Sequence, residues 1–253
     1  MLTKDTAICI RTTDYSETSQ IVTLFTKAAG KISAIAKGSK RPKSAFDGPL
    51  EVLSYGRIVF SDSNREKLAT LTEFQQNPAF SCSADNLFVL NCCLFGTELV
   101  NALTHDYDPH PELFDAFLQF LQDANEHQEH RKVLTLLILF QLILLREIGL
   151  MPILNACANC KIRYPISNTR YEAYFSSSAN GLICKDCEAS FQDKIKLTKN
   201  AANCLVNTKL LTEVEEKTLD EIQLVLIKHF TEILHRQPRM AKYILNSGGI
   251  AGN

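Results

Sequence analysis

The chain of 253 residues contains no tryptophan and neither of the glycine-rich loops that hold phosphates in ATPases and dinucleotide-binding enzymes. No apolar segment of the signal-peptide type follows residues 1–5, so we expect a cytoplasmic protein whose nine cysteines stay reduced. The most apolar stretch, residues 133–145, is interrupted by Gln141 and is too short to cross a bilayer. We therefore expect no membrane partner.

Acidic residues are also absent between Glu17 and Asp47, although the net charge of the whole chain is −1. This window holds six basic residues, namely Lys27, Lys31, Lys37, Lys40, Arg41 and Lys43. Such charges repel one another unless a polyanion neutralises them, and binding by counterion release depends strongly on salt. A run of ordinary surface lysines on a solvated loop is the commoner origin of this pattern. The window nevertheless favours nucleic acid as a partner.

Short segments rich in β-branched residues fill the first 80 positions. The alternation predicts strands at residues 6–11, 20–26, 31–36, 51–60 and 67–73. Turn residues separate them at positions 28–30, 37–42 and 61–64. Five strands with a long connection after the third fit a small closed barrel such as an OB-fold, although an SH3-type barrel would give almost the same pattern.

Aromatic side chains are interleaved with the basic ones in this barrel. Phe25 and Phe60 lie in apolar strand centres and are expected in the core, so Tyr15 and Tyr55 are the better candidates for stacking on bases. A barrel whose open face binds single strands would contact phosphates through Arg11, Lys31, Lys37, Lys40, Arg41, Lys43 and Arg57.

The pattern changes to helices from about residue 84. Apolar residues at helical spacing predict helices near residues 86–103, 111–121, 133–145 and 219–233. We therefore predict an α+β protein with an OB-fold domain at residues 1–80, a helical domain at 81–246 and a flexible tail at 247–253.

Two C-x-x-C pairs organise the second half of the chain. Cys157 and Cys160 are followed, after 23 residues, by Cys184 and Cys187. Four thiolates can surround one Zn²⁺ and leave no position open for water or substrate, so a structural zinc knuckle is predicted at residues 155–190. The remaining cysteines lie among apolar residues and are interpreted as small core residues: Cys9, Cys82, Cys92, Cys93 and Cys204.

The N-terminal run Asp14–Thr26, followed by Gly30-Lys31, Ala36-Lys-Gly38 and Arg41–Ser44, resembles the signature of the RecO recombination-mediator family. The two cysteine pairs, with Tyr174-Phe175 and Gly181 between them, resemble the zinc segment of the same family. Two features depart from its pattern: Lys161 stands where a glycine commonly follows the second cysteine, and residues 239–245 match only loosely.

The resemblance implies an OB-fold, a helical domain with a zinc insertion, and a location in the bacterial cytosol or nucleoid. It implies DNA repair and recombination without catalysis: binding of single- and double-stranded DNA, and annealing of strands. It further implies that the protein, with RecR, loads the recombinase onto DNA coated by single-stranded DNA-binding protein.

Two other classes of protein have some support. A protein-interaction adaptor would use the apolar helices, where Arg131, Lys132 and Arg146 could border a groove for an acidic peptide. A zinc nucleobase deaminase would need H-x-E before P-C-x-x-C, and the chain offers two H-x-E triplets, at residues 110–112 and 127–129. Ala156 replaces the required proline, however, and the second cysteine pair would lack a metal.

Overall fold

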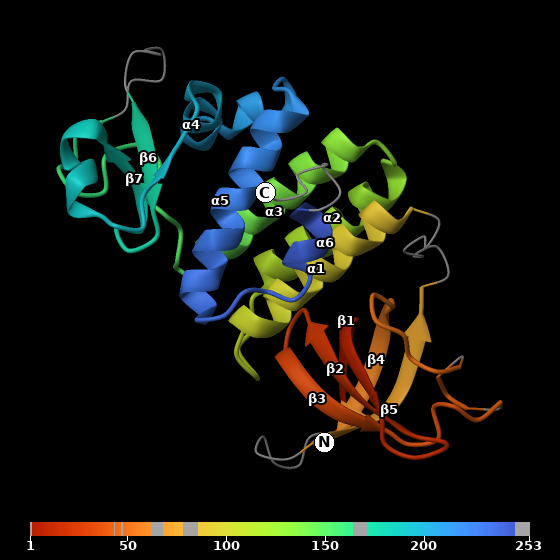
Figure 1. Cartoon of the computed structure of the whole chain (residues 1–253). Coiled ribbons are helices and arrows are strands. Elements are labelled where there is room, and N and C mark those ends of the chain that lie inside the picture. The colour runs from red at the N-terminus through yellow and green to blue at the C-terminus, as the bar shows by residue number, and fades with distance from the viewer. Residues whose placement is uncertain are drawn as a thin grey trace. The chain divides into compact units, whose positions relative to one another are not determined.

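The structure is a computed structural model of the chain and describes residues 2–42, 44–46, 48–61, 68–77, 86–163 and 172–245. It divides into two compact units, Met1–Glu126 and His127–Asn253 (Figure 1). Within the described ranges, the helices are all too short or too polar to cross a membrane. Residues 62–64 of the predicted turn at 61–64, together with Lys43, Cys82 and the predicted tail at 247–253, lie outside those ranges.

The first unit begins with a closed five-stranded barrel, drawn in red and orange in Figure 1. Its strands are β1 (Leu2–Asp14), β2 (Gln20–Thr26), β3 (Gly30–Ala36), β4 (Tyr55–Ser61) and β5 (Ala69–Gln76). They follow the order β1-β2-β3-β5-β4 and close back on β1, with only the β3–β5 pair parallel. The predicted OB-fold and its five strands are confirmed.

Strand β1 extends well beyond its predicted range, residues 6–11, because it serves two neighbours. Residues 2–8 pair with β4 and residues 7–14 pair with β2, and a register shift lies between Cys9 and Arg11 within the β1–β2 pairing. A bulge of this kind bends a strand and increases its twist, which closes a small barrel. A long bent strand is therefore what completes the OB-fold.

Helices α1 (Leu87–Leu103) and α2 (Pro111–Glu126) complete the first unit. Asn86 caps α1, because its side-chain oxygen accepts the backbone N–H groups of Phe88 and Val89. Pro111 occupies the first turn of α2, where a missing N–H has no cost. Both helices begin within one residue of the predicted positions.

The second unit is built on α3 (His130–Glu147) and α5 (Glu216–Leu234), which pack against each other. Smaller elements surround them: β6 (Ala173–Ser176), β7 (Gly181–Cys184), η1 (Lys185–Ser190), β8 (Ile195–Lys196), α4 (Lys199–Val206), η2 (Thr208–Thr212) and α6 (Ala241–Leu245). The three strands form a sheet in the order β7-β6-β8. This sheet and its cysteines, residues 151–163 and 172–197, are called the zinc module below, after the metal that the sequence predicts for it.

Candidate nucleic-acid interface and metal centre

The basic loop after β3 is tied to the turn between β1 and β2. The backbone N–H of Lys40 donates to the Thr18 carbonyl at 3.2 Å, and that of Gly38 donates to Ser19 Oγ at 3.1 Å. Gly38 has a φ of 73°, which glycine adopts without the steric cost that a side chain adds. Residues 15–19 and 37–41 therefore form one end of the barrel, called the basic end below.

Gln20 anchors this end from inside the barrel. Its side-chain oxygen accepts the hydroxyl of Ser39 and the N–H of Leu50, both at 3.0 Å, while its amide donates to the Leu50 carbonyl at 3.1 Å. Gln20 is buried, so these bonds are shielded from water and fix the start and the end of the loop. Sequence reasoning missed this residue, although a glutamine at an inward position of an apolar strand is a signal for such a role.

Three predicted DNA-contacting residues and one predicted stacking residue meet at the basic end. Tyr15 exposes 62% of its surface, and Lys37 and Arg41 are exposed. Lys40 is half-buried, and its ammonium lies 2.5 Å from Asp14. An aromatic ring beside cations is the combination that binds bases and phosphates of single strands.

Lys31 lies at the other end of β3, roughly 20 Å from Lys37 at about 3.3 Å per residue. Its ammonium donates to the carbonyls of Asn101 at 2.9 Å and Thr104 at 2.6 Å, at the C-terminal end of α1. A cation there complements the partial negative charge of the helix end. Lys31 therefore joins the barrel to α1, and its charge is used within the protein.

The other stacking candidate, Tyr55, also lies away from the basic end. Its ring faces Phe114 of α2 with centroids 6.5 Å apart. Phe25 is fully buried against the rings of Phe114 and Phe117, and Phe60 is buried in the barrel, so the prediction that both phenylalanines are core residues is confirmed.

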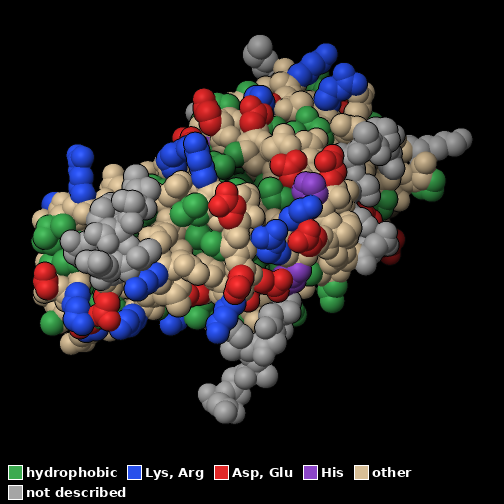
Figure 2. Space-filling model, turned by 90° about the horizontal axis from the view of Figure 1, so that it is seen from above, with side chains coloured by type: hydrophobic (Ala, Val, Ile, Leu, Met, Phe, Trp, Pro, Cys, Tyr) green, Lys and Arg blue, Asp and Glu red, His purple; other side chains and the backbone are tan. Residues whose placement is uncertain are grey.

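The remaining basic residues of the barrel are dispersed. Arg11 and Arg57 are exposed on β1 and β4, whereas Lys27 pairs with Asp115 of α2 at 2.7 Å. On the face shown in Figure 2, basic and acidic side chains of the described residues alternate without forming a field of one sign. A polyanion site on that face would therefore be local.

The four cysteines of the C-x-x-C pairs converge in the zinc module. Their sulfur atoms all lie within 4.8 Å of one another, and those of Cys160 and Cys184 are 3.7 Å apart. Four sulfurs at about 2.3 Å from one Zn²⁺ would be about 3.8 Å apart, so the cluster has the size that a tetrahedral site requires. Among the described residues, these four are the one group of His, Cys, Asp or Glu placed to hold a metal, and His110 and His127 are not part of it.

Backbone N–H groups surround the cluster. Burial raises the pKa of the Cys157 thiol, but N–H groups of Cys160, Cys184 and Asn159 stabilise its thiolate and lower the pKa to about 6. The Asn159 side chain also donates to the sulfur of Cys187 at 3.3 Å. Thiolates are the metal-binding form of cysteine, so these donors favour a bound cation.

Lys161 stands where the family pattern commonly has a glycine, and it keeps a backbone conformation typical of glycine. Its φ of 64° lies in the left-handed region, which glycine enters most easily. The knuckle closes around this residue, because the Lys161 N–H donates to the Cys157 carbonyl at 2.9 Å. The Lys161 ammonium donates back to the Ala158 carbonyl at 2.6 Å.

The predicted core cysteines within the described ranges are buried: Cys9, Cys92, Cys93 and Cys204. Burial raises the pKa of the Cys9 thiol to about 12 and that of Cys204 to about 11. They are inert core residues, as predicted.

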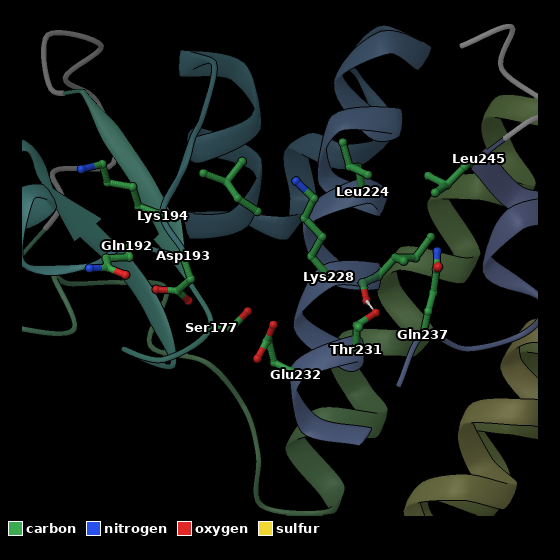
Figure 3. Close-up of a pocket in the computed structure, with 12 residues that line it drawn as sticks. Ser177, Gln192, Asp193, Lys194, Leu224, Lys228, Thr231, Glu232, Gln237 and Leu245 are labelled. Atoms are coloured by element: carbon green, nitrogen blue, oxygen red, sulfur yellow. Dashed lines mark hydrogen bonds between the residues drawn. The ribbon is translucent and has the colours of Figure 1, made fainter. Parts of the chain in front are cut away.

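A cavity of about 390 Å³ lies between the zinc module and α5 (Figure 3). Its polar groups serve the fold: Asp193 accepts bonds from Ser176 and Ser178, and Lys194 pairs with Glu188 at 3.3 Å. The Thr231 hydroxyl donates to the carbonyl one helical turn earlier, at 2.8 Å. Each of these contacts lies within the zinc module or within α5, and none of them assembles a catalytic group among the described residues that line the cavity.

A smaller cavity of about 250 Å³ lies beside α3, and two of the predicted groove residues border it. Arg131 and Lys132 line it with Thr135 and Leu136, whereas Arg146 pairs with Glu147 and does not line it. The Arg131 guanidinium donates to the carbonyl of Thr212, the last residue of η2, and to the carbonyl of Val214, at 3.2 Å each. The cavity therefore has an apolar wall and a cationic rim.

A closed OB-fold barrel with a basic end, followed by a helical unit with a four-cysteine cluster, defines an OB-fold protein with a separate module that could hold a metal ion. The family described as Recombination protein O N terminal matches residues 1–77, and Recombination protein O C terminal matches residues 84–238. The chain belongs to the RecO family of DNA repair proteins.

Curated relatives cover most of the chain. The DNA repair protein RecO of Rhodopirellula baltica is 34% identical over 216 residues, which are 85% of this chain and 77% of that protein. RecO of Bacillus pumilus is 29% identical over 92% of this chain and 89% of its own, and RecO of Bacillus subtilis is 32% identical over 81% and 76%.

Proposed function

We propose that this protein is a non-catalytic recombination mediator that binds single- and double-stranded DNA through the basic end of its barrel. The observation that carries the proposal is the meeting of Tyr15 with the exposed cations Lys37 and Arg41 on two loops tied together by hydrogen bonds. Lys40 lies on the same loop, where its ammonium pairs with Asp14. Cations spaced along a loop neutralise phosphates, and the exposed ring offers a face to a base.

Strand annealing follows from charge neutralisation alone. Two complementary strands repel each other through their phosphates, and a protein surface that holds both lowers this repulsion while the bases pair. No catalytic residue is needed for this step. Partnership with RecR in recombinase loading is carried over from the family resemblance.

The proposal is tested by the salt dependence of oligonucleotide binding. Replacing Lys37 and Arg41 together by alanine should weaken binding to all sequences alike and reduce the slope of log K against log salt by about 0.7 to 0.9 per charge. Lys31→Ala is the matched control, because Lys31 belongs to the same basic window but is bound to the end of α1. It should lower stability and leave the slope unchanged.

An unchanged slope in the Lys37 and Arg41 variant would contradict the proposal. Absence of oligonucleotide binding by the intact protein at low salt would favour the adaptor instead.

We further propose that the cavity beside α3 receives the acidic tail of single-stranded DNA-binding protein. Leu136 and Thr135 supply apolar contact, and Arg131 and Lys132 supply positive charge. Glu129 lies 3.7 Å from Arg131 and 3.4 Å from Lys132, so it competes with an acidic ligand. Glu129→Gln should therefore strengthen binding of an acidic tail peptide, and Lys132→Ala should weaken it. Equal affinities in both variants would refute this site.

The four-cysteine cluster is proposed to hold one structural Zn²⁺ through Cys157, Cys160, Cys184 and Cys187. The support is the sulfur geometry and the thiolate-stabilising N–H groups. A full shell of sulfur leaves zinc no open position for substrate, so the metal stabilises the module and takes no part in chemistry. Metal analysis should find one zinc per chain, and replacement of Cys160 by serine should lower that content.

A further inference from the structure

The four sulfur atoms of the cysteine cluster differ in their access to solvent. Cys157 is fully buried and Cys187 exposes 8% of its surface, whereas Cys184 is half-buried and Cys160 is exposed. Among the described cysteines, Cys160 alone is exposed. Oxidation of thiolates follows their exposure, so an oxidant dissolved in water reaches the sulfur of Cys160 before the others.

A second sulfur lies within reach of the exposed one. The sulfur of Cys184, from the other C-x-x-C pair, is 3.7 Å from that of Cys160. A disulfide requires about 2.05 Å, so each of the two sulfurs would move by about 0.8 Å to form one. An exposed thiolate beside a second cysteine is the arrangement that converts a single oxidation into a disulfide.

The other two sulfurs are held in place. The Cys157 sulfur accepts the backbone N–H of Cys184 at 3.4 Å, and the Cys187 sulfur accepts the side-chain amide of Asn159 at 3.3 Å. Both cysteines also belong to the buried core of the zinc module, whereas Cys184 packs at the edge of that core. Moving either buried sulfur towards Cys160 would therefore strain a hydrogen bond and disturb the core.

We propose that Cys160 is an oxidation site, that Cys184 is its resolving partner, and that a peroxide thereby exchanges the bound zinc for a disulfide between the two cysteine pairs. The proposal rests on the zinc ion proposed for this cluster. The Cys160 thiolate attacks one peroxide oxygen, the O–O bond breaks and hydroxide leaves, which gives a sulfenic acid. The Cys184 thiolate then attacks that sulfur, forms the S–S bond and displaces a second hydroxide. Two electrons pass from the sulfurs to the peroxide, and the metal leaves as Zn²⁺ because two of its four ligands are gone.

The disulfide would join the same two segments that the metal joins. Cys160 lies in the first cysteine pair, ahead of the strands of the module, and Cys184 is the last residue of β7. Cys157 and Cys187 stay in the buried core as free thiols. Oxidation should therefore release the metal without loosening the zinc module, whereas chelation leaves the two pairs without any link. A thiol reductant reverses the exchange.

The experiment treats the full zinc-loaded chain with hydrogen peroxide and follows released zinc, the position of the disulfide and amide hydrogen exchange. One zinc should be lost for each disulfide formed, and mass spectrometry of a non-reducing digest should find Cys160 linked to Cys184. Exchange in β6 and β7 should stay slow, and a thiol reductant with added zinc should restore the original zinc content. The matched control is Cys204→Ser, which removes a buried cysteine outside the cluster and should respond as the parent protein does.

Three results would overturn the proposal. One is a disulfide within either C-x-x-C pair, and another is zinc release while all four thiols of the cluster stay reduced. The third is rapid exchange in β6 and β7 of the oxidised protein, because the disulfide would then fail to replace the metal.

Two histidine variants separate the exposed pair of sulfurs from the cluster as a whole. Both offer zinc three sulfurs and one nitrogen, a ligand set that occurs in structural sites. Cys160→His removes the exposed thiol, so the zinc that it binds should remain bound at the peroxide dose that empties the parent protein. Cys187→His keeps Cys160 and Cys184, and its zinc should be released as in the parent. Equal release from both variants would refute the role of Cys160, and the linkage found in the parent decides if a variant binds no zinc.

The oxidation site and the proposed zinc site fail in different ways. If metal analysis finds no zinc in the untreated protein, the zinc site fails. If zinc is present and peroxide leaves it bound, or links other cysteines, the zinc site stands and only the oxidation site is refuted.

Discussion

At the scale of single residues, Lys161 shows how a departure from a family pattern can carry a cost. A left-handed backbone conformation costs an L-residue roughly 1 to 2 kcal/mol, and glycine avoids this cost. Glycine also loses more conformational entropy on folding, which offsets about 0.5 to 1 kcal/mol of the gain from replacing Lys161. We therefore expect Lys161→Gly to raise the stability of the zinc module by roughly 0.5 to 1 kcal/mol.

Zinc release against a competing chelator measures this effect. The control is Lys161→Ala, which removes the same ammonium and its bond to Ala158 but keeps a side chain at φ 64°. Equal zinc retention in the glycine and alanine variants would show that the backbone at this position stores no strain.

His229 of α5 gives the second prediction at this scale. Its ring is buried edge-on to Phe175 of β6, with centroids 5.2 Å apart, and neither nitrogen has a hydrogen-bond partner within the described ranges. Burial lowers the pKa of His229 from 6.5 to about 4. Between these values the unfolded chain binds a proton that the folded chain excludes, so the free energy of unfolding falls as pH drops from about 6.5 towards 4, by an amount on the order of 3 kcal/mol.

Denaturant unfolding across this pH range, compared with His229→Phe, checks the prediction. Phenylalanine keeps an aromatic ring beside Phe175 and does not titrate, so the difference between the two curves isolates the histidine from the thiols of the metal cluster. Parallel curves would show that His229 keeps its ordinary pKa.

At the scale of elements, Gln141 is the polar interruption in the most apolar helix. It is buried on α3, and its amide donates to Gln223 Oε1 of α5 at 2.7 Å, while the Gln223 amide donates back to it at 3.3 Å. Replacing Gln141 by leucine alone leaves the Gln223 amide buried without this partner, which should cost about 1 to 3 kcal/mol. Replacing both by leucine should recover most of the loss.

Thermal or denaturant unfolding of the two single variants and the double variant measures this coupling. A double variant that loses the sum of the single losses would mean that the glutamines act independently.

The strands and long helices could be predicted because each carries a repeating apolar pattern over many residues. Strands β6 and β8 span four and two residues, too few for any pattern to appear. The charge run gave Lys31 and Lys37 equal weight, and only the fold shows that one binds the end of α1 while the other is exposed. Contacts between distant segments, such as Gln141 with Gln223, are likewise invisible in a local pattern.

At the scale of the whole molecule, the chain divides into two compact units, each with its own stabilising features. The first rests on a closed barrel with α2 packed over Phe25. In the second, the zinc module has only short strands, and its small core includes Cys157 and Cys187 themselves. A core made partly of metal ligands loses its support when the metal leaves.

Metal removal should therefore affect the two units differently. With a strong chelator, amide hydrogen exchange should become fast in the zinc module and stay slow in β1 to β5, because no barrel residue belongs to the four-cysteine cluster. Oligonucleotide binding should be retained if the basic end carries it.

The control is the Cys204→Ser variant, because Cys204 is a buried cysteine outside the cluster. In this variant the zinc module should stay protected from exchange until chelator is added. Exchange that accelerates equally in the barrel would show that the units fold as one, and loss of DNA binding with an intact barrel would move the DNA site to the metal module.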